Sequence, residues 1–296
     1  MINVSYVTSG NENIASFRYR VLAPAKGLVQ HFIKPSIGRL ATKESNVVVF
    51  SKHWTYNDWS YAKFCKLRGQ KVIFDVCDDH FDGKLSDHYR RMVDVADGIT
   101  CNSKTMSAII HEKTGRDSEV IVDPVLSPRI EPNFQPQPNL LWYGQAMNIQ
   151  GLYDVYTKDC LYPLEVVVPG NLNPPEHFQA PWITWVPWHK DVIPEAATRN
   201  NIAILPYRQG KDAKSANRVL EALQCGMMVL TDPIPAVVEL GKNGIRYLDK
   251  PLNEVIDSIK GSDCTFEILE SQKIIDATYS QEVIAAKWAH VFRSLA

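Results

Sequence analysis

Two sets of alternating strand and helix patterns predict an α/β protein with two domains, each built on a parallel sheet. Between the sets, residues 123–138 contain five prolines in sixteen positions, a density that interrupts both helices and central strands. We therefore expect an N-terminal domain over 1–125, a linker over 126–138, a C-terminal domain over 139–280 and a last helix over 281–296.

The strands of the first domain are brief apolar runs, continuous enough to be buried on both faces of a sheet. They are predicted over 2–7, 47–50, 71–76 and 98–101. Helical patterns separate them over 18–30, 57–68, 86–96 and 103–114. Strands that alternate with helices in this way predict right-handed crossovers.

The second domain repeats this alternation after the linker. Its strands are predicted over 140–144, 164–168, 183–187, 202–206 and 227–231. Helices are predicted over 150–156, 191–199, within 214–226, and over 252–260 and 266–278. In open α/β sheets ligands bind at the carboxyl ends of the strands, so a cleft between the two domains is the expected site.

Composition excludes several classes of protein. The chain of 296 residues is 45% hydrophobic and 22% charged, which is typical of a folded soluble protein, and no apolar run is long enough to suggest a membrane span. The formal charge of −1 disfavours a sequence-independent grip on nucleic acid. The N-terminus enters a strand pattern directly, and the six cysteines are scattered, so we expect a cytoplasmic protein with reduced thiols.

The segment 214–226 (KSANRVLEALQCG) is the most informative stretch of the chain. It predicts a polar loop, a helix and a glycine stop before an apolar strand. One helix face carries Val219, Leu220 and Leu223. Lys214, Asn217 and Glu221 are three and four residues apart, so they are predicted to share another face. Helix starts attract phosphate, and a carboxylate one turn later can accept ribose hydroxyls. Spacing alone leaves open an ordinary amphipathic helix with a solvated polar face.

With the strands on either side of it, this segment resembles the donor-binding half of GT-B glycosyltransferases of the retaining group 1, family 4-like type. The resemblance extends over 202–240 and, less closely, over 75–124. It implies two facing Rossmann-like domains, a last helix over 281–296 that crosses back to the first domain, and a glutamate that holds the ribose of a nucleotide sugar. Glu221 occupies that position. A second glutamate of the family, close to the transferred sugar, is replaced by Ala213.

The loop after the first strand offers small residues and two arginines. Gly10 permits close backbone approach, and Arg18 or Arg20 could reach an anion at the start of the following helix. The resemblance places this loop opposite the donor, with Arg18 as a donor-binding residue. The alternative is a normal loop with surface arginines.

Polar residues follow two more strands of the first domain. Asp78 and Asp79 are adjacent and suit neither an acid/base pair nor a metal site. The resemblance implies that Asp79 or His80 orients the acceptor or sugar hydroxyls, against a structural capping role. Lys52 and His53 follow another strand and would stand at the rim of the cleft, although such loop residues are more often solvated.

The first loop of the second domain departs from the family. Gly144 is retained for close approach to the donor, but the arginine and lysine that clamp the diphosphate are replaced by Gln145 and Gln150. Positive charge must then come from Arg18 or from the cations before the 214–226 helix. Those cations are Arg208, Lys211, Lys214 and Arg218.

These observations predict an enzyme that moves a sugar from a nucleotide-diphosphate sugar to an acceptor hydroxyl, with no metal or other cofactor. Motifs of dehydrogenases, P-loop kinases, metalloproteases and serine hydrolases are absent. Two alternatives stay open: a GT-B enzyme that modifies a hydroxylated DNA base, and a degenerate domain that binds a nucleotide or glycan, or scaffolds a partner, without turnover.

Overall fold

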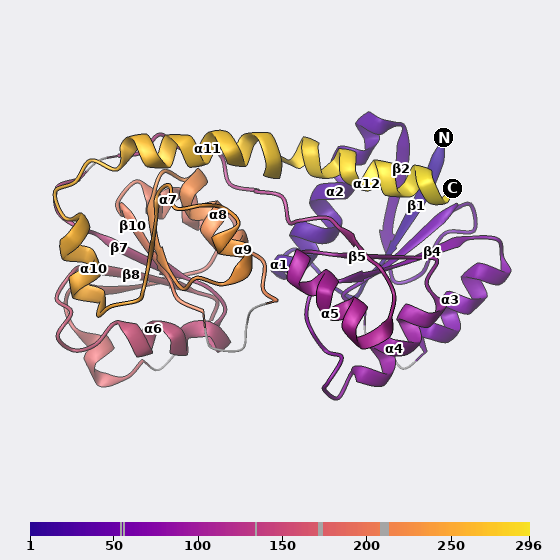
Figure 1. Ribbon diagram of the computed structural model, residues 1–296, viewed down its shortest axis with the longest axis horizontal. Coiled ribbons are helices and arrows are strands. Elements are labelled where there is room, and N and C mark those ends of the chain that lie inside the picture. The colour runs from indigo at the N-terminus through magenta and orange to yellow at the C-terminus, as the bar shows by residue number, and fades with distance from the viewer. Residues whose placement is uncertain (54, 56, 134, 171–173, 208–212) are drawn as a thin grey trace. The chain divides into compact units, whose positions relative to one another are not determined.

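The structure is a computed structural model of residues 1–296, and it describes all of them except 54, 56, 134, 171–173 and 208–212. The chain forms two compact units. Unit 1 contains residues 1–126, 213–215 and 278–296, and unit 2 contains 127–212 and 216–277. Each unit is an α/β body with its own parallel sheet (Figure 1).

The sheet of unit 1 has the strand order β2-β1-β3-β4-β5-β6, and every pairing in it is parallel. The strands are β1 (Ile2–Val7), β2 (Ile33–Gly38), β3 (Val47–Ser51), β4 (Lys71–Val76), β5 (Gly98–Cys101) and β6 (Glu119–Val120). β3 is buried along its whole length and β4 from its second residue, as the continuous apolar runs predict.

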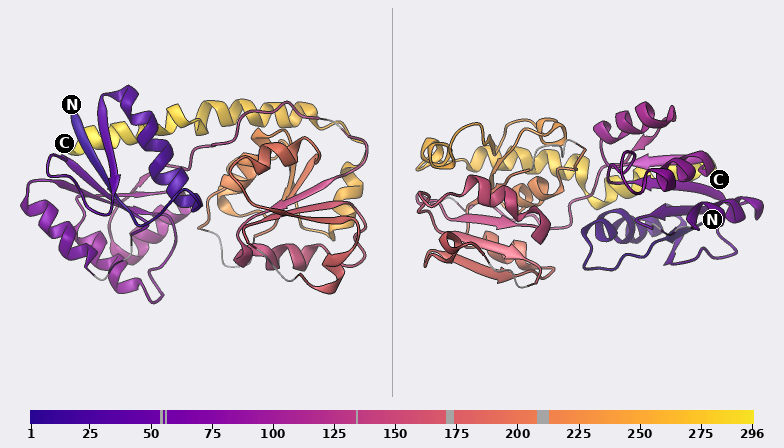
Figure 2. Two further views of the ribbon diagram at one scale, coloured as in Figure 1. Left: turned by 180° about the vertical axis from the view of Figure 1, so that it is seen from behind. Right: turned by 90° about the horizontal axis from the view of Figure 1, so that it is seen from below.

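Helices cover both faces of this sheet (Figure 2). They are α1 (Ala15–Phe17), η1 (Arg18–Leu22), α2 (Ala23–Leu28), η2 (Val29–His31), α3 (Asp58–Leu67), α4 (Ser86–Val95), α5 (Lys104–Thr114) and α12 (Gln281–Leu295). The helix predicted over 18–30 is thus divided, and η1 is a π-helical segment. The last helix of the chain does pack in the core of unit 1, where the Trp288 ring meets the Tyr6 ring edge-on at 6.2 Å.

The sequence patterns did not predict three strands. These are β2 and β6 of unit 1 and β12 (Ile245–Tyr247) of unit 2. β2 is an edge strand with Lys34, Pro35 and Ser36 at its centre. Pro35 lacks an N–H, which an edge strand tolerates because one side of it has no strand partner. The local sequence therefore resembles a loop, and only the pairing of β2 with β1 makes it a strand.

The sheet of unit 2 has the order β12-β11-β10-β7-β8-β9 and is also parallel. Its other strands are β7 (Leu140–Tyr143), β8 (Leu164–Val168), β9 (Ile183–Pro187), β10 (Ile202–Leu205) and β11 (Met228–Thr231). Its helices are η3 (Ala146–Asn148), α6 (Ile149–Val155), η4 (Glu176–Gln179), α7 (Val192–Ala197), α8 (Asn217–Gln224), α9 (Pro235–Val238), α10 (Leu252–Ile259) and α11 (Thr265–Tyr279), whose last two residues belong to unit 1. No helix in the described part of the chain is both long and apolar enough to cross a bilayer.

The described residues of the proline-rich segment form neither helix nor strand, and two of them, Ser127 and Ile130, contact α8. Ile130 donates its N–H to the Gln224 carbonyl at 2.9 Å and accepts a hydrogen bond from the Gln272 amide at 2.8 Å. Gly226 ends the turn after α8 with φ +77°. A Cβ there would lie 2.8 Å from the Ile130 carbonyl oxygen. The glycine is therefore needed both for its backbone conformation and for this close approach.

We expect Gly226→Ala to lower the free energy of unfolding by about 2 to 4 kcal/mol, because left-handed strain of about 1 to 2 kcal/mol adds to the clash with Ile130. Gly261 is a matched control, since its φ is +76° and a Cβ there would meet nothing within 4 Å. Gly261→Ala should lower the free energy of unfolding only by the left-handed strain, about 1 to 2 kcal/mol. Urea unfolding measures both variants, and equal losses would contradict the packing argument.

Candidate functional site

The strand order of unit 2 reverses direction between β7 and β10. From β7 the chain adds β8 and β9 on one side, and later β10, β11 and β12 on the other. Such a switch point opens a crevice at the carboxyl ends of the two strands, where α/β proteins bind ligands. The end of β7 leads into Gly144, and the end of β10 leads into Pro206.

Arg218 lies at this switch point. Its guanidinium donates to the Tyr143 carbonyl at the end of β7 (3.3 Å) and to the Pro206 carbonyl after β10 (3.4 Å). The same group lies 4.9 Å from the centre of the Tyr207 ring, and a Cβ on Gly144 would come within 3.2 Å of its Nη1. A cation is thus held where the two central strands end.

Glu221 is buried on α8, one turn after Arg218, with 5% of its surface exposed. Its Oε2 accepts the backbone N–H of Ser127 at 2.9 Å. A carboxylate has about four acceptor positions, and this bond occupies one of them. Burial raises the pKa of the nearby Tyr143 hydroxyl well above its usual value, and the negative charge of Glu221 raises it further. That hydroxyl donates to the Arg218 carbonyl.

Lys214 does not share a helix face with Asn217 and Glu221, and the prediction that it does was wrong. α8 begins at Asn217, whose side-chain oxygen accepts the N–H of Arg218 at 2.8 Å. Lys214 precedes the helix, in the short stretch that belongs to unit 1, and its Nζ lies 2.5 Å from the Asp78 carboxylate. Arg208 lies outside the described residues.

Unit 1 has its own switch point, between β1 and β3. The loops after these strands touch there, since Ser9 Oγ donates to the Lys52 carbonyl at 3.3 Å. Lys52 adopts a left-handed backbone conformation with φ +50°. A Cβ on Gly10 would meet the Phe17 side chain at 3.0 Å, and Arg18 donates to the Glu12 carbonyl at 2.7 Å. Gly10 and Lys52 are therefore brought to one place.

Asp78 joins two lysines beside this switch point. Its carboxylate bonds Lys52 and Lys214, a cluster with a net charge of +1. Burial lowers the pKa of Lys52. Asp79 is exposed and accepts the N–H of Phe81 at 3.1 Å, within a turn that precedes α4. The His80 ring stands edge-on to Tyr89 at 5.2 Å.

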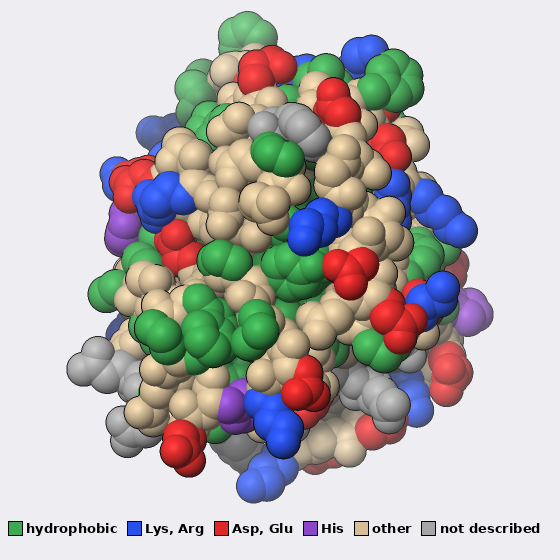
Figure 3. Space-filling view, turned by 90° about the vertical axis from the view of Figure 1, so that its left-hand side faces the viewer, with side chains coloured by type: hydrophobic (Ala, Val, Ile, Leu, Met, Phe, Trp, Pro, Cys, Tyr) green, Lys and Arg blue, Asp and Glu red, His purple; other side chains and the backbone are tan. Residues whose placement is uncertain are grey.

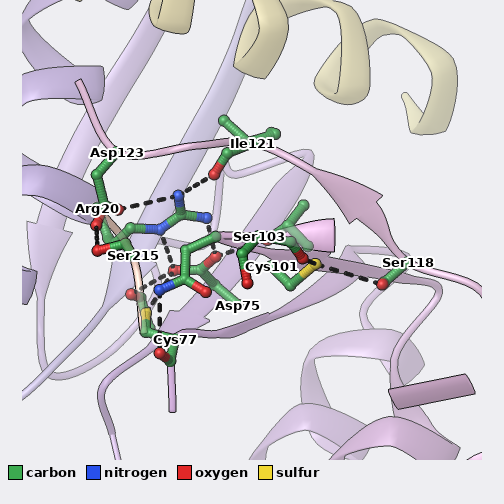
Figure 4. A network of polar contacts seen from close by, with 12 residues as sticks. Arg20, Asp75, Cys77, Cys101, Ser103, Ser118, Ile121, Asp123 and Ser215 are labelled. Carbon is green, nitrogen blue, oxygen red and sulfur yellow. Dashed lines mark hydrogen bonds and ion pairs between the residues drawn. The ribbon is translucent and has the colours of Figure 1, made fainter. Parts of the chain in front are cut away.

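Arg20 is a structural residue rather than an anion ligand at the surface. Its side chain is 1% exposed and makes two hydrogen bonds to Asp75, at 3.2 and 2.5 Å (Figure 4). It also donates to the Ile121 carbonyl and lies 3.4 Å from Asp123, which accepts the Ser215 hydroxyl at 2.8 Å. The Arg20 guanidinium is therefore paired inside unit 1 and does not serve as the anion-binding group that the sequence suggested.

His53 belongs to a cluster around Asp58. The Asp58 carboxylate accepts His53 Nδ1 at 2.8 Å and the Thr55 N–H at 2.8 Å, and it lies 3.8 Å from His88 Nε2. Burial acts to raise the pKa of Asp58, but the hydrogen bonds from His53 and Thr55 outweigh it and lower the pKa. Burial lowers the pKa of His88, against the opposing pull of Asp58.

These two shifts predict that acid destabilises unit 1. The folded state favours neutral His88, so its contribution is present above the unfolded pKa of about 6.5 and is lost as pH falls through that value. The lowered pKa of Asp58 adds a second loss at lower pH. We expect the melting temperature to fall between about pH 7.5 and about pH 5.5, and His88→Gln to flatten that slope. His290→Gln, at an exposed position of α12, should keep the wild-type slope; equal slopes in all three proteins would refute the assignment.

Comparison with known proteins adds the decisive observation on the fold. No family model matches the chain, and no curated protein sequence matches it. Solved structures do match. Anabaena HepE in complex with UDP and glucose has a TM-score of 0.72 at 12% identity, covering 99% of this chain and 100% of that one. A glycosyltransferase from Rickettsia africae has a TM-score of 0.68 at 13% identity over 99% and 98%. The chain has the GT-B fold.

A third GT-B structure, phage T4 BGT with UDP and Mn²⁺, has a TM-score of 0.58 at 13% identity, with 99% of each chain covered. At such identities the likeness concerns the fold alone. Within this GT-B chain, Gln145 is exposed, and Gln150 bonds Asp154 at 2.8 Å on the surface of α6. Among the described residues, no group of three or more His, Cys, Asp or Glu side chains could hold a metal ion.

The sequence did not single out Tyr143, Tyr207 and Asp232 as part of the unit 2 site. The Asp232 carboxylate accepts the Tyr207 N–H at 2.7 Å and so fixes the loop that carries the ring beneath Arg218. Burial raises the pKa of Asp232. A signal was present, since Tyr207 and Asp232 directly follow predicted strands and Tyr143 is the last residue but one of another.

Proposed function

We propose that the protein is a glycosyltransferase that moves a sugar from a nucleotide-diphosphate sugar to an acceptor hydroxyl. One observation carries the proposal: Arg218 and buried Glu221 lie together at the switch point of unit 2 in a GT-B fold. The pairing of a cation with a carboxylate one turn later suits a nucleotide whose diphosphate and ribose are bound side by side.

In this proposal unit 2 binds the donor. Glu221 accepts hydrogen bonds from the ribose hydroxyls, and the start of α8 with Arg218 faces the diphosphate. As the bond to the sugar breaks, negative charge grows on the leaving diphosphate, and fixed cations stabilise it without reorganisation. Arg218 replaces the positive charge that Gln145 and Gln150 lack.

Unit 1 would contribute the Lys52–Asp78–Lys214 cluster and the acceptor-side residues Asp79 and His80. We propose a retaining outcome and a reaction without a bound metal, which the resemblance over 202–240 supports. Both are separately testable: the anomeric configuration of the product by NMR, and turnover with EDTA or with added Mn²⁺.

The test of the proposed function is a panel of UDP-, GDP-, ADP- and CMP-sugars, each assayed for a shift in melting temperature and for release of the nucleoside diphosphate. The proposal expects one nucleotide class to bind and to be turned over, even slowly by hydrolysis. Binding without turnover would favour the non-catalytic alternative, since the altered Gln145, Gln150 and Ala213 positions are its main support. Neither binding nor turnover with any donor would refute the proposal.

A further inference from the structure

The outward side of α3 in unit 1 carries large apolar side chains where a solvated helix would be polar. Ser60, Lys63, Phe64 and Leu67 are all exposed and follow the i, i+3, i+4, i+7 spacing of one helix face. Phe64 is 52% exposed and Leu67 is 87% exposed. The inward side of the helix, by contrast, buries Ala62 and Cys65.

A neighbouring loop extends this apolar surface. Leu40, in the connection between β2 and β3, is 69% exposed. The next residue, Ala41, donates its N–H to the Tyr61 hydroxyl at 2.8 Å, and the Tyr61 ring stacks on Phe64 with ring centres 6.4 Å apart. The Gln70 amide, just after α3, donates to the Thr42 carbonyl at 2.9 Å. The loop is therefore fixed beside the helix.

The segment that carries these apolar residues has an excess of positive charge, although two of its lysines, Lys52 and Lys66, pair with Asp78 and Asp97. Residues 39–71 contain seven Lys or Arg and only two Asp or Glu, in a chain whose net charge is −1. One of the two acids, Asp58, is buried and bonded to His53. Arg39, Lys43 and Lys63 are exposed, and the Lys63 ammonium lies 4.5 Å from the centre of the Trp59 ring.

The end face of unit 2 drawn in Figure 3 serves as a contrast. There, small groups of hydrophobic side chains lie among both acidic and basic ones. Phe266 is 73% exposed in unit 2, and Leu161 is 66% exposed. Exposed apolar residues are thus not confined to the region of α3, but the segment 39–71 that carries Leu40, Phe64 and Leu67 has more Lys and Arg than Asp and Glu.

We infer that the α3 face, defined as Leu40, Phe64 and Leu67 with Arg39, Lys43 and Lys63, docks unit 1 on an anionic lipid surface. Such a surface offers negative headgroups to the cations and hydrocarbon to the apolar side chains. A nucleic acid would satisfy only the cations. Trp59 and Tyr61, on the same helix, are residue types that favour the membrane interface. The inference stands independently of the proposed function.

The test is sedimentation with vesicles of phosphatidylcholine alone or with phosphatidylglycerol, using the full chain. We expect binding only to the anionic vesicles, weakening as salt is added. Phe64→Ser/Leu67→Ser should lower the partition coefficient by about a hundredfold, about tenfold for each side chain. The matched control is Phe266→Ser/Leu161→Ser, which exchanges the same residue types in unit 2 and should bind as the wild type does.

Circular dichroism melts of both double variants serve as the control for folding. Heparin serves as a polyanion without hydrocarbon. Two results together would overturn the inference in favour of a purely electrostatic surface. The wild type would bind heparin as well as it binds anionic vesicles, and Phe64→Ser/Leu67→Ser would bind vesicles as the wild type does. No binding of the wild type to anionic vesicles would overturn it as well. Turnover of soluble nucleotide sugars should be the same in both variants, so this result is separate from the proposed function.

Discussion

Glu221→Ala is expected to weaken binding of the nucleotide donor by about a hundredfold, because hydrogen bonds to a charged group contribute about 1.5 to 3 kcal/mol each. In the wild type the buried carboxylate is held by the Ser127 N–H and lies on α8 behind Arg218. In the proposed complex this carboxylate would accept hydrogen bonds from the ribose hydroxyls. Calorimetric titration with the nucleotide selected by the donor panel measures the loss.

Glu221→Gln provides the control for structure. The amide oxygen can still accept the Ser127 N–H, so the melting temperature should change little, while loss of the charge should weaken nucleotide binding by about tenfold. If Glu221→Ala is folded and binds the nucleotide as tightly as the wild type does, Glu221 has no role in donor binding.

The second large effect is expected at the buried ion pair of unit 1. Asp75→Asn should lower the free energy of unfolding by about 3 to 5 kcal/mol, because it leaves the Arg20 charge buried with less compensation. Burial alone would lower the pKa of Arg20, but Asp75 raises it well above its usual range, so Arg20 stays charged. Ser51 and Thr100 each donate to Asp75 at 2.8 Å and would also lose a charged acceptor.

A double variant separates the pair from simple packing loss. Arg20→Met removes the charge. The double variant with Asp75→Asn should lose at least about 1 kcal/mol less unfolding free energy than the two single variants lose in sum. Urea midpoints of the four proteins close the cycle. Strictly additive losses would mean that the two side chains act independently, against the geometry of Figure 4.

The α/β architecture was predictable because buried parallel strands are continuous apolar runs. β1 begins and ends at the residues predicted, and β7 differs by one residue. β2 was not predictable in the same way, because its stability comes from pairing with β1 rather than from its own sequence. The π-helical segment η1 was missed for a related reason, since periodicity cannot distinguish it from the α-helix on either side.

The candidate residues were predictable as strand-end positions, but their partners were not. Gly144 ends one predicted strand and Lys52 comes two residues after another, and both lie at switch points. Loop side chains choose partners through tertiary structure, so the bond of Lys214 to Asp78 could not be read from helix spacing. Arg20 was misjudged because its counter-ion, Asp75, is 55 positions away in the sequence. An aspartate inside a buried strand was the available signal.

The location of the bound nucleotide decides whether Glu221 and Arg218 of unit 2 hold the donor. A crystal structure with the nucleoside diphosphate selected by the panel measures it as difference density. We expect the ribose hydroxyls within hydrogen-bonding distance of the Glu221 carboxylate and the diphosphate beside Arg218 at the start of α8. Density at any other place, with Glu221 still bonded only within the protein, would contradict this expectation.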